Sequence, residues 1–271
     1  MINNTDFFFL YKTEYILNGK PLRQIATEYH MGDNTLIKKF GELDLPLKRP
    51  GQRTGNKISK LNNKAFDVWS KDMAYWLGFI AADGYVASNR NSLGVKLSAK
   101  DSDHLVKLLN FLGSEKQVIT YAMKYQNGIA DMSYISISDQ YLYDKLISLG
   151  IKPNKTYLNT NYLEYIPEEY QDSFLIGYFD GDGTIGYVGK ENFPFRIGYC
   201  ALSSDFMKAV RDYFCAKHEF TEVAIVKSKK RKMSSVTWGS KGNVVVFARM
   251  YLELGNTTLN RKRSIIETIN Y

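Results

Sequence analysis

The sequence predicts an α+β protein whose larger part consists of two pseudo-symmetric halves, each with the order helix, strand, strand, helix, strand, strand, helix. Two observations carry this prediction. A short stretch occurs twice, at 73–84 and 172–183, and a similar order of helical and strand-like segments follows each copy. A small all-helical region precedes the halves. The predicted boundaries are 1–44 for the helical region, 45–71 for a basic linker, 72–156 for the first half, 157–170 for a connector and 171–271 for the second half.

Residues 1–44 predict three short helices. Ile25 and Ala26 supply an apolar face, Gly32 makes a turn, and Asp33 suits the N-cap of the third helix. The pattern is typical of a helix-turn-helix, whose second helix enters the major groove of DNA. The side chains that this helix would present are Asn34, Thr35, Lys38 and Lys39. Three-helix units also dock proteins, and that alternative stays open.

The linker is strongly basic. Residues 45–64 contain six Lys and Arg and no acid, and their prolines and glycines exclude a continuous helix. An extended basic segment can follow a phosphate backbone or lie in a minor groove, although a solvated tether would also be polar. The predicted DNA contacts are Lys48, Arg49, Arg53 and Lys57.

The repeated stretch predicts two apolar helices that pack on each other. Small residues lie four positions apart in both copies, Gly78 with Ala82 and Gly177 with Gly181. Residues at this spacing share one helix face, so the two backbones can approach closely. Each copy ends in Asp-Gly, and we expect the glycine to adopt the left-handed conformation that often closes a helix.

Packing of these helices would bring Asp83 and Asp182 together at one end of the pair. Both would lie at the negative end of a helix dipole, and each would raise the pKa of the other. A divalent cation would resolve this conflict, and oxygen ligands suit Mg²⁺ or Ca²⁺ rather than zinc. One copy alone would favour an ordinary core helix followed by a turn, whereas two copies within a longer repeat favour a metal site.

The remaining elements repeat in order. The first half predicts strands at 85–88 and 92–98, a helix at 101–112, a hairpin turned at Asn127-Gly128 with a strand at 133–138, and a helix at 140–149. The second half predicts strands at 184–190 and 194–201, a helix at 204–216, a hairpin within 220–240, and a helix at 243–254. The offset between matched glycines grows from 99 at Gly84 and Gly183 to 105 at Gly150 and Gly255, as hairpins of different length would give.

Composition restricts the class of protein. The net charge of +8 and the isoelectric point near 9.2 favour a polyanionic partner, although basic proteins with other roles exist. Cys200 and Cys215 lack the spacing of a metal site or disulfide framework, which suits a reducing compartment, and His30, His104 and His218 are scattered. No apolar run reaches membrane-spanning length, and neither a signal nor a transit peptide is evident, so we expect a cytoplasmic, nucleoid-associated protein without a membrane partner.

The two stretches Trp76–Gly84 and Leu175–Gly183 resemble the LAGLIDADG motif of homing endonucleases. The resemblance runs from Asp72 to the end of the chain and includes the order of helices and hairpins. It implies a monomeric, site-specific endonuclease that hydrolyses both strands of double-stranded DNA within a long asymmetric target. Mg²⁺ would be the cofactor, with Mn²⁺ or Ca²⁺ as possible substitutes.

The resemblance also implies roles for individual residues. The last acid of each motif binds the catalytic metals in that family, which implies Asp83 and Asp182 here, together with the glycines that follow them, Gly84 and Gly183. The family's earlier motif acid matches Asp180 in the second copy, whereas the first copy has alanine. A basic residue after the last helix of each half implies catalytic roles for Lys155 and Lys262, with Arg261 as an alternative to the second lysine.

DNA would contact the outer faces of the strands. Leu93, Val95 and Leu97 alternate with polar residues, which assigns the polar positions to the outer face. The predicted DNA contacts are Lys96 and Ser98 in this strand and, by the same parity in other strands, Ser136 and Thr237, with Arg196 as a further candidate. The predicted hairpin tip adds Lys229, Lys230 and Arg231 as phosphate contacts, although a basic tip can also be a solvated loop.

Two further functions are compatible with the same fold. A DNA-binding regulator could keep the fold without cutting, but the presence of both Asp83 and Asp182 argues against it. An RNA maturase that assists intron splicing would bind RNA instead of, or in addition to, DNA.

Overall fold

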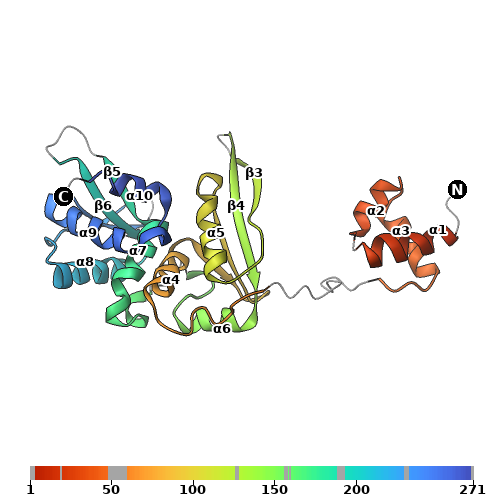
Figure 1. Cartoon of the computed structure of the whole chain (residues 1–271), viewed down its shortest axis with the longest axis horizontal. Coiled ribbons are helices and arrows are strands. Elements are labelled where there is room, and N and C mark those ends of the chain that lie inside the picture. The colour runs from red at the N-terminus through yellow and green to blue at the C-terminus, as the bar shows by residue number, and fades with distance from the viewer. Residues whose placement is uncertain are drawn as a thin grey trace. The chain divides into compact units, whose positions relative to one another are not determined.

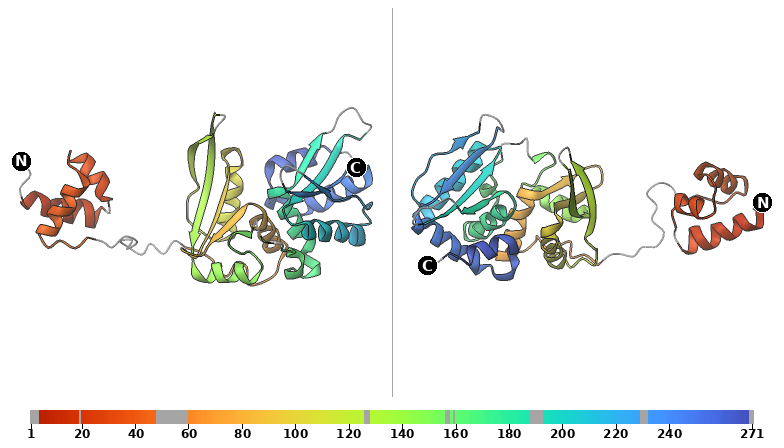
Figure 2. Two further views of the ribbon diagram at one scale, coloured as in Figure 1. Left: turned by 180° about the vertical axis from the view of Figure 1, so that it is seen from behind. Right: turned by 90° about the horizontal axis from the view of Figure 1, so that it is seen from above.

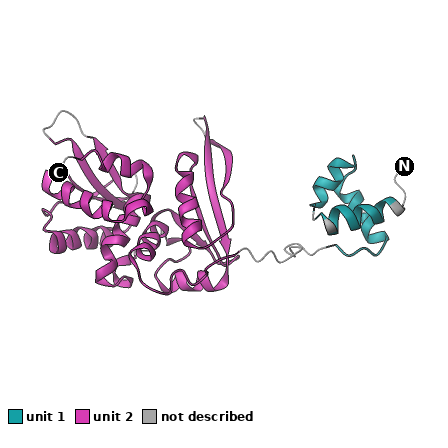
Figure 3. Cartoon of the chain, viewed as in Figure 1, with its two compact units in different colours: residues 1–59 teal, residues 60–271 magenta. Residues whose placement is uncertain are grey.

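The computed structural model describes residues 4–18, 20–47, 60–125, 128–155, 158, 160–187, 193–228 and 232–269. The chain divides into two compact units, residues 1–59 and 60–271 (Figure 3). Several predicted DNA contacts lie outside the described residues, namely Lys48, Arg49, Arg53, Lys57, Lys229, Lys230 and Arg231. Within the described ranges, no helix has both the length and the apolar character needed to cross a bilayer.

Unit 1 contains the three predicted helices (Figure 1). They are α1 Asn4–Phe9, which continues as a π-helical segment Leu10–Leu17, α2 Leu22–Glu28 and α3 Asp33–Glu42. Ile25 and Ala26 are fully buried beside Leu36 and Phe40, so the predicted apolar face is confirmed. The predicted N-cap is wrong by one position. Gly32 is the N-cap of α3, and Asp33 lies in the first turn, where its charge complements the helix dipole.

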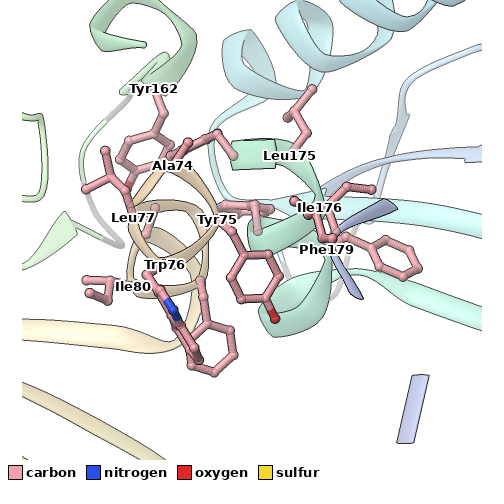
Figure 4. Close-up of a cluster of buried hydrophobic side chains, with 14 of the residues drawn as sticks. Ala74, Tyr75, Trp76, Leu77, Ile80, Tyr162, Leu175, Ile176 and Phe179 are labelled. Atoms are coloured by element: carbon pink, nitrogen blue, oxygen red, sulfur yellow. The ribbon is translucent and has the colours of Figure 1, made fainter. Parts of the chain in front are cut away.

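Two central helices organise unit 2. Helix α4 Lys71–Asp83 begins at Ser70, whose side chain accepts a hydrogen bond from the backbone nitrogen of Met73, and α7 Gln171–Asp182 packs against it. A Cβ on Gly78 would overlap the backbone carbonyl of Phe174 in the other helix. A Cβ on Gly177 would overlap the carbonyl of Tyr75 in the same way. The predicted close approach is confirmed, and Figure 4 shows the apolar side chains of both helices around it.

The glycines after the two helices differ from expectation. Gly84 (φ −78°, ψ 161°) and Gly183 (φ −82°, ψ 161°) are extended and not left-handed. Glycine is needed there for a steric reason. A Cβ on Gly84 would lie 2.7 Å from the carbonyl oxygen of Ile80, and one on Gly183 would lie 2.5 Å from that of Phe179. The chain therefore turns directly from helix to strand, close against the last helical turn.

Each half contains a four-stranded antiparallel sheet (Figure 2). The first has the order β1-β2-β4-β3 and the second the order β5-β6-β8-β7. The bounds are β1 Gly84–Ala87, β2 Ser92–Ser98, β3 Ile119–Tyr125, β4 Gly128–Ser138, β5 Thr184–Tyr187, β6 Phe195–Ala201, β7 Val226–Lys227 and β8 Ser234–Trp238. Leu93, Val95 and Leu97 are buried as the alternation predicted, and so are Val236 and Trp238.

Helices cover the inner face of each sheet. In the first half these are α5 Ser102–Phe111 and α6 Gln140–Ser148; in the second half they are α8 Ser204–His218 and α9 Lys241–Glu253. Short 3₁₀ helices occur at Ala99–Asp101, Tyr162–Tyr165, Glu168–Tyr170 and Gly255–Thr257. The structure confirms the α+β class and the order of elements in both halves.

A last helix, α10 Asn260–Ile266, was not predicted. It has two turns, and its sequence Asn-Arg-Lys-Arg-Ser-Ile-Ile lacks a helical apolar period. It is held by tertiary contacts, since Ile266 is fully buried and Lys262 is 3% exposed. This helix therefore places a buried lysine beside the central pair.

Candidate active site

The C-terminal ends of α4 and α7 meet. Asp83 and Asp182 are the last residues of these helices. Gly181 faces the end of α4, because a Cβ on it would overlap Cβ of Ala82 and lie 3.3 Å from Cγ of Asp83. The second small-residue position thus brings the two predicted acids to the same end of the helix pair.

Both carboxylates lie in an environment that disfavours their negative charge. Burial, and secondly the charge of Asp182, raise the pKa of Asp83 to about 6. Burial also raises the pKa of Asp182, whereas Lys155 and a 3.4 Å hydrogen bond from the Tyr178 hydroxyl lower it. Tyr178 was missed in the sequence, although it precedes Asp182 by four residues and so shares its helix face.

Lys155 closes the end of α4. Its Nζ donates hydrogen bonds to the carbonyl oxygens of Ala81 and Ala82, the latter at 2.5 Å. Burial lowers the pKa of Lys155 to about 8, and the charges of Asp182 and Asp83 oppose this effect. A lysine at a helix C-terminus satisfies carbonyls that lack an intrahelical donor and complements the dipole.

Lys262 closes the end of α7 in the same way. Its Nζ donates to the carbonyl oxygens of Phe179, Asp180 (3.1 Å) and Gly183 (2.6 Å). Burial lowers the pKa of Lys262 to about 8, opposed chiefly by the charge of Asp180. The alternative residue, Arg261, points elsewhere, because its Nε lies 3.3 Å from Oδ1 of Asp101. The structure therefore brings all four predicted catalytic side chains to one place.

Two cavities adjoin the acids. One of about 360 Å³ is lined by Asp182 and Lys155 together with Tyr162, Tyr178 and Ser203. The other, of about 580 Å³, is lined by Asp83 and Gly84 and again by Lys155. Each acid thus has space beside it for a ligand, and Lys155 borders both spaces.

The donor set fits a hard divalent cation. In the described part of the chain, no group of three or more Asp, Glu, His or Cys side chains could hold a metal ion. Two carboxylates that face unfavourable desolvation and mutual repulsion are nevertheless suited to Mg²⁺, which binds through one or two carboxylates and keeps several waters. The Gly183 carbonyl accepts a hydrogen bond from Lys262, and the predicted part of Gly84 and Gly183 in metal binding stays a prediction.

Asp180 is a structural acid, a role that sequence reasoning missed. It is 2% exposed, and it accepts hydrogen bonds from the Tyr75 hydroxyl (2.5 Å), the Tyr251 hydroxyl (2.7 Å) and the backbone nitrogen of Leu259 (2.8 Å). Burial raises its pKa, and Lys262 is the first of several groups that lower it. Asp180 thereby connects α4 with α7, α9 and the start of α10. A buried acid inside an apolar helix requires hydrogen-bond donors around it. The position of Asp180 within the apolar stretch therefore could have indicated its structural role.

His104 extends this network. Its Nε2 lies 3.0 Å from the Tyr75 hydroxyl, and its ring is fully buried. Because the hydroxyl donates to Asp180, its oxygen accepts from His104, which places the imidazole proton on Nε2. Burial lowers the pKa of His104 to about 3, so the ring is neutral at physiological pH. His104 is therefore part of the core and not a ligand.

Replacing Asp180 by leucine is expected to lower the free energy of unfolding by about 3 kcal/mol, because the Tyr75 hydroxyl and the Leu259 amide would lose their buried acceptor. Asp180→Asn should cost less, since the Tyr251 hydroxyl also bonds the Leu259 carbonyl at 3.2 Å and can accept from the amide. Urea titration measures both values. The exposed Asp131→Asn is the control and should change stability by less than about 0.5 kcal/mol. Equal values for all three variants would contradict the network.

The predicted strand contacts lie on the outer faces. Ser98, Ser136, Arg196 and Thr237 are exposed, and Lys96 is half-buried. Nζ of Lys96 lies 5.2 Å from the Tyr121 ring centroid and 3.0 Å from the sulfur of Met123. The outer face of the first sheet is thus more aromatic than the sequence pattern indicated.

The helical part of unit 1 is close to neutral. Residues 1–47 contain 5 Lys and Arg and 6 Asp and Glu, so the positive charge of this region lies in the linker. On α3, Asn34, Thr35 and Lys38 are exposed, and Lys39 is half-buried. Nζ of Lys38 and of Lys39 lie 3.9 Å and 2.7 Å from the Glu42 carboxylate. Charge therefore does not single out α3 as a surface for phosphates.

Comparisons with known proteins support the fold. No protein-family model matches the chain. The homing endonuclease I-WcaI bound to its DNA recognition sequence is similar over 84% of this chain and 98% of that one, with 13% identity and a TM-score of 0.51. Full-length DUF199/WhiA from Thermatoga maritima is similar over 77% of this chain and 63% of that one, with 17% identity and a TM-score of 0.46. I-SmaMI bound to an uncleaved DNA target in the presence of calcium ions is similar over 68% and 85%, with 15% identity and a TM-score of 0.41.

The similarity to I-WcaI, at 13% identity, shows the fold alone. The chain has the α+β fold of LAGLIDADG type, with two four-stranded sheets around a pair of central helices. It spans less than two thirds of the length of full-length DUF199/WhiA.

Proposed function

We propose that this protein is a site-specific double-stranded DNA endonuclease of the LAGLIDADG family that depends on a divalent cation. One observation carries the proposal: the adjoining ends of α4 and α7 hold Asp83 beside Asp182, with a lysine bonded to the carbonyls of each helix end. Low-identity similarity to I-WcaI supports the fold on which this site is built.

The electrostatics of the site favour cutting over binding alone. Two neighbouring, largely buried carboxylates in a protein of net charge +8 are unfavourable for stability and would repel phosphates. Strongly perturbed groups of this kind cluster at functional sites. A protein that only binds DNA gains nothing from them, whereas a metal-dependent nuclease needs them.

Each residue has a defined task in this proposal. Asp83 and Asp182 would hold the cation, which when bound supplies an activated water and neutralises charge that develops on the phosphate. The charges of Lys155 and Lys262 lower the pKa of Asp83, which favours the ionised, ligand form of this carboxylate at neutral pH. Each lysine also satisfies terminal carbonyls of one central helix, Lys155 those of α4 and Lys262 those of α7.

The test is direct. A library of duplex targets is incubated with the protein and Mg²⁺, and we expect staggered cuts within one long sequence that stop when a chelator is added. Binding without cleavage at any divalent cation would favour a DNA-binding regulator. Binding to a structured intron RNA, with promotion of its splicing, would favour a maturase.

Neutralising the linker is expected to weaken DNA binding in a salt-dependent way. Replacing Lys48, Arg49, Arg53 and Lys57 by glutamine removes up to four phosphate contacts, and each contact contributes about −0.9 to the slope of log K against log salt. Fluorescence anisotropy on a target duplex, in an Asp182→Asn background that prevents cutting, measures the slope.

The comparison variant Lys38→Gln/Lys39→Gln should reduce the slope less per charge removed, because both amines already face Glu42. If the linker variant keeps the wild-type slope, the linker does not follow the DNA backbone.

A further inference from the structure

The two sheets present matching rows of outward positions with different chemistry. In the first sheet Tyr85 pairs with Gly94, which pairs with Ser136. In the second, Thr184 pairs with Gly198, which pairs with Thr237. Tyr85 and Thr184 are each the second residue after a central helix ends, so the rows are equivalent in the two halves. Both rows have glycine on the middle strand, but the position on the strand after the central helix is Tyr85 in the first half and Thr184 in the second.

The outer face of the first sheet is aromatic and apolar. The Tyr85 ring covers Gly94, because a Cβ there would overlap it. Tyr85 and Ile119 are each 51% exposed and Tyr121 is 37% exposed, and the Tyr121 ring packs edge-on against Tyr134 at 5.6 Å. Lys96 is drawn against Tyr121. This face therefore offers large aromatic and apolar surfaces beside its polar groups.

The centre of the outer face of the second sheet is small and polar. The Thr184 and Thr237 hydroxyls converge over Gly198, where a Cβ would lie 2.9 Å and 3.0 Å from them. In the next row Gly186 pairs with Arg196, and the Arg196 side chain crosses Gly239, since a Cβ there would lie 3.3 Å from its Nε. Arg196 is thus an exposed residue beside Gly186 on β5 and beside Gly239, which directly follows β8.

We infer that the two halves of the target differ in chemistry: Tyr85, Ile119 and Tyr121 recognise thymine methyl groups, and Arg196, with the Thr184 and Thr237 hydroxyls, recognises a guanine-containing half-site. The inference rests on the proposed DNA binding. In the major groove, thymine is the base that presents a methyl group. Guanine presents two acceptors, O6 and N7, to which one arginine side chain can donate two hydrogen bonds. Under the proposed function, the two sheets, one from each half, contact the same duplex.

Binding-site selection from random duplexes, using the full chain with Asp182→Asn, identifies the two half-sites without requiring cleavage. We expect a thymine-rich half and a half with at least one invariant guanine. Selection of a duplex with similar halves would overturn the inference but leave the proposed function intact. Selection of no duplex at all would overturn both.

Base analogues then assign the contacts. Replacing guanine by 7-deazaguanine should weaken binding about 10-fold for the wild type and leave Arg196→Ala unaffected, because the N7 contact is already lost. Replacing thymine by deoxyuridine should weaken the wild type about 5-fold and leave Tyr85→Thr/Tyr121→Ala unaffected. Equal sensitivity of wild type and variant to its analogue would refute that contact. Arg196→Lys and Tyr121→Phe, with thermal melting, show whether a loss reflects misfolding.

Discussion

Replacing Gly177 by alanine is expected to destabilise unit 2 by more than about 4 kcal/mol, enough to prevent its folding at physiological temperature. The added Cβ would overlap the carbonyl oxygen of Tyr75 and lie 2.7 Å from its carbon and 3.0 Å from the Phe79 nitrogen. All three atoms belong to the α4 backbone, so no side-chain rotation relieves the overlap. The two central helices would have to separate, and much of the apolar contact between the halves would be lost.

A matched glycine separates this steric effect from helix propensity. Gly242 lies inside α9, and a Cβ on it would meet no described atom within 4 Å. Gly242→Ala should raise the free energy of unfolding by up to about 1 kcal/mol, since alanine favours the helix. Chemical denaturation followed by circular dichroism measures both variants. If Gly177→Ala is as stable as Gly242→Ala, the backbone contact between α4 and α7 is incorrect.

Replacing Asp83 by asparagine should abolish cleavage while making the metal-free protein more stable. The rate is expected to fall by at least about 10³-fold, because one of two carboxylate ligands is lost. The free energy of unfolding should rise by up to about 3 kcal/mol, since the native pKa of Asp83 is about 6 against an ordinary value of 3.8. Asp182→Asn should act in the same direction.

The pH dependence follows from the sign of this shift. A carboxyl group with a raised native pKa binds a proton in the folded state before it does so in the unfolded state. Its destabilising contribution is therefore complete above about pH 6 and disappears as the pH falls toward 3.8. The stability difference between wild type and Asp83→Asn, measured in a chelating buffer, should shrink from pH 7 to pH 4. A difference that stays constant over this range would show that Asp83 is not perturbed.

The central pair could be predicted because its cause is local and occurs twice. Small residues four apart at Gly78 and Gly177 indicate a close helix contact, and the terminal acids then follow from helix geometry. The strand faces were predictable for a similar reason, since Leu93, Val95 and Leu97 alternate with outward residues. In both cases a sequence period directly determines which side chains share one face of a helix or strand.

Other features depend on contacts between distant segments. Gly84 and Gly183 were expected to adopt a left-handed φ angle. Glycine is instead required because a Cβ at either position would overlap the preceding helical turn. The role of Asp180 depends on Tyr75 and Tyr251, which lie 105 and 71 residues away. A sequence pattern that describes one element cannot reveal partners at such separations.

The two lysines at the site have different structural surroundings. Lys262 lies on α10 and donates to three carbonyls at the end of α7, those of Phe179, Asp180 and Gly183. Asp180 holds the start of α10 through the backbone nitrogen of Leu259. Lys155 directly follows the turn at residues 153–154, borders both cavities and donates to two carbonyls of α4. The residue equivalent to Asp180 in that half is Ala81. The two helix ends are therefore held with unequal rigidity.

This inequality has a kinetic consequence for a nuclease. The two strands of a bound duplex would lie beside helix ends of different rigidity. We therefore expect the two strands to be cleaved one after the other. A singly nicked plasmid, open and relaxed, would then accumulate before the linear product forms.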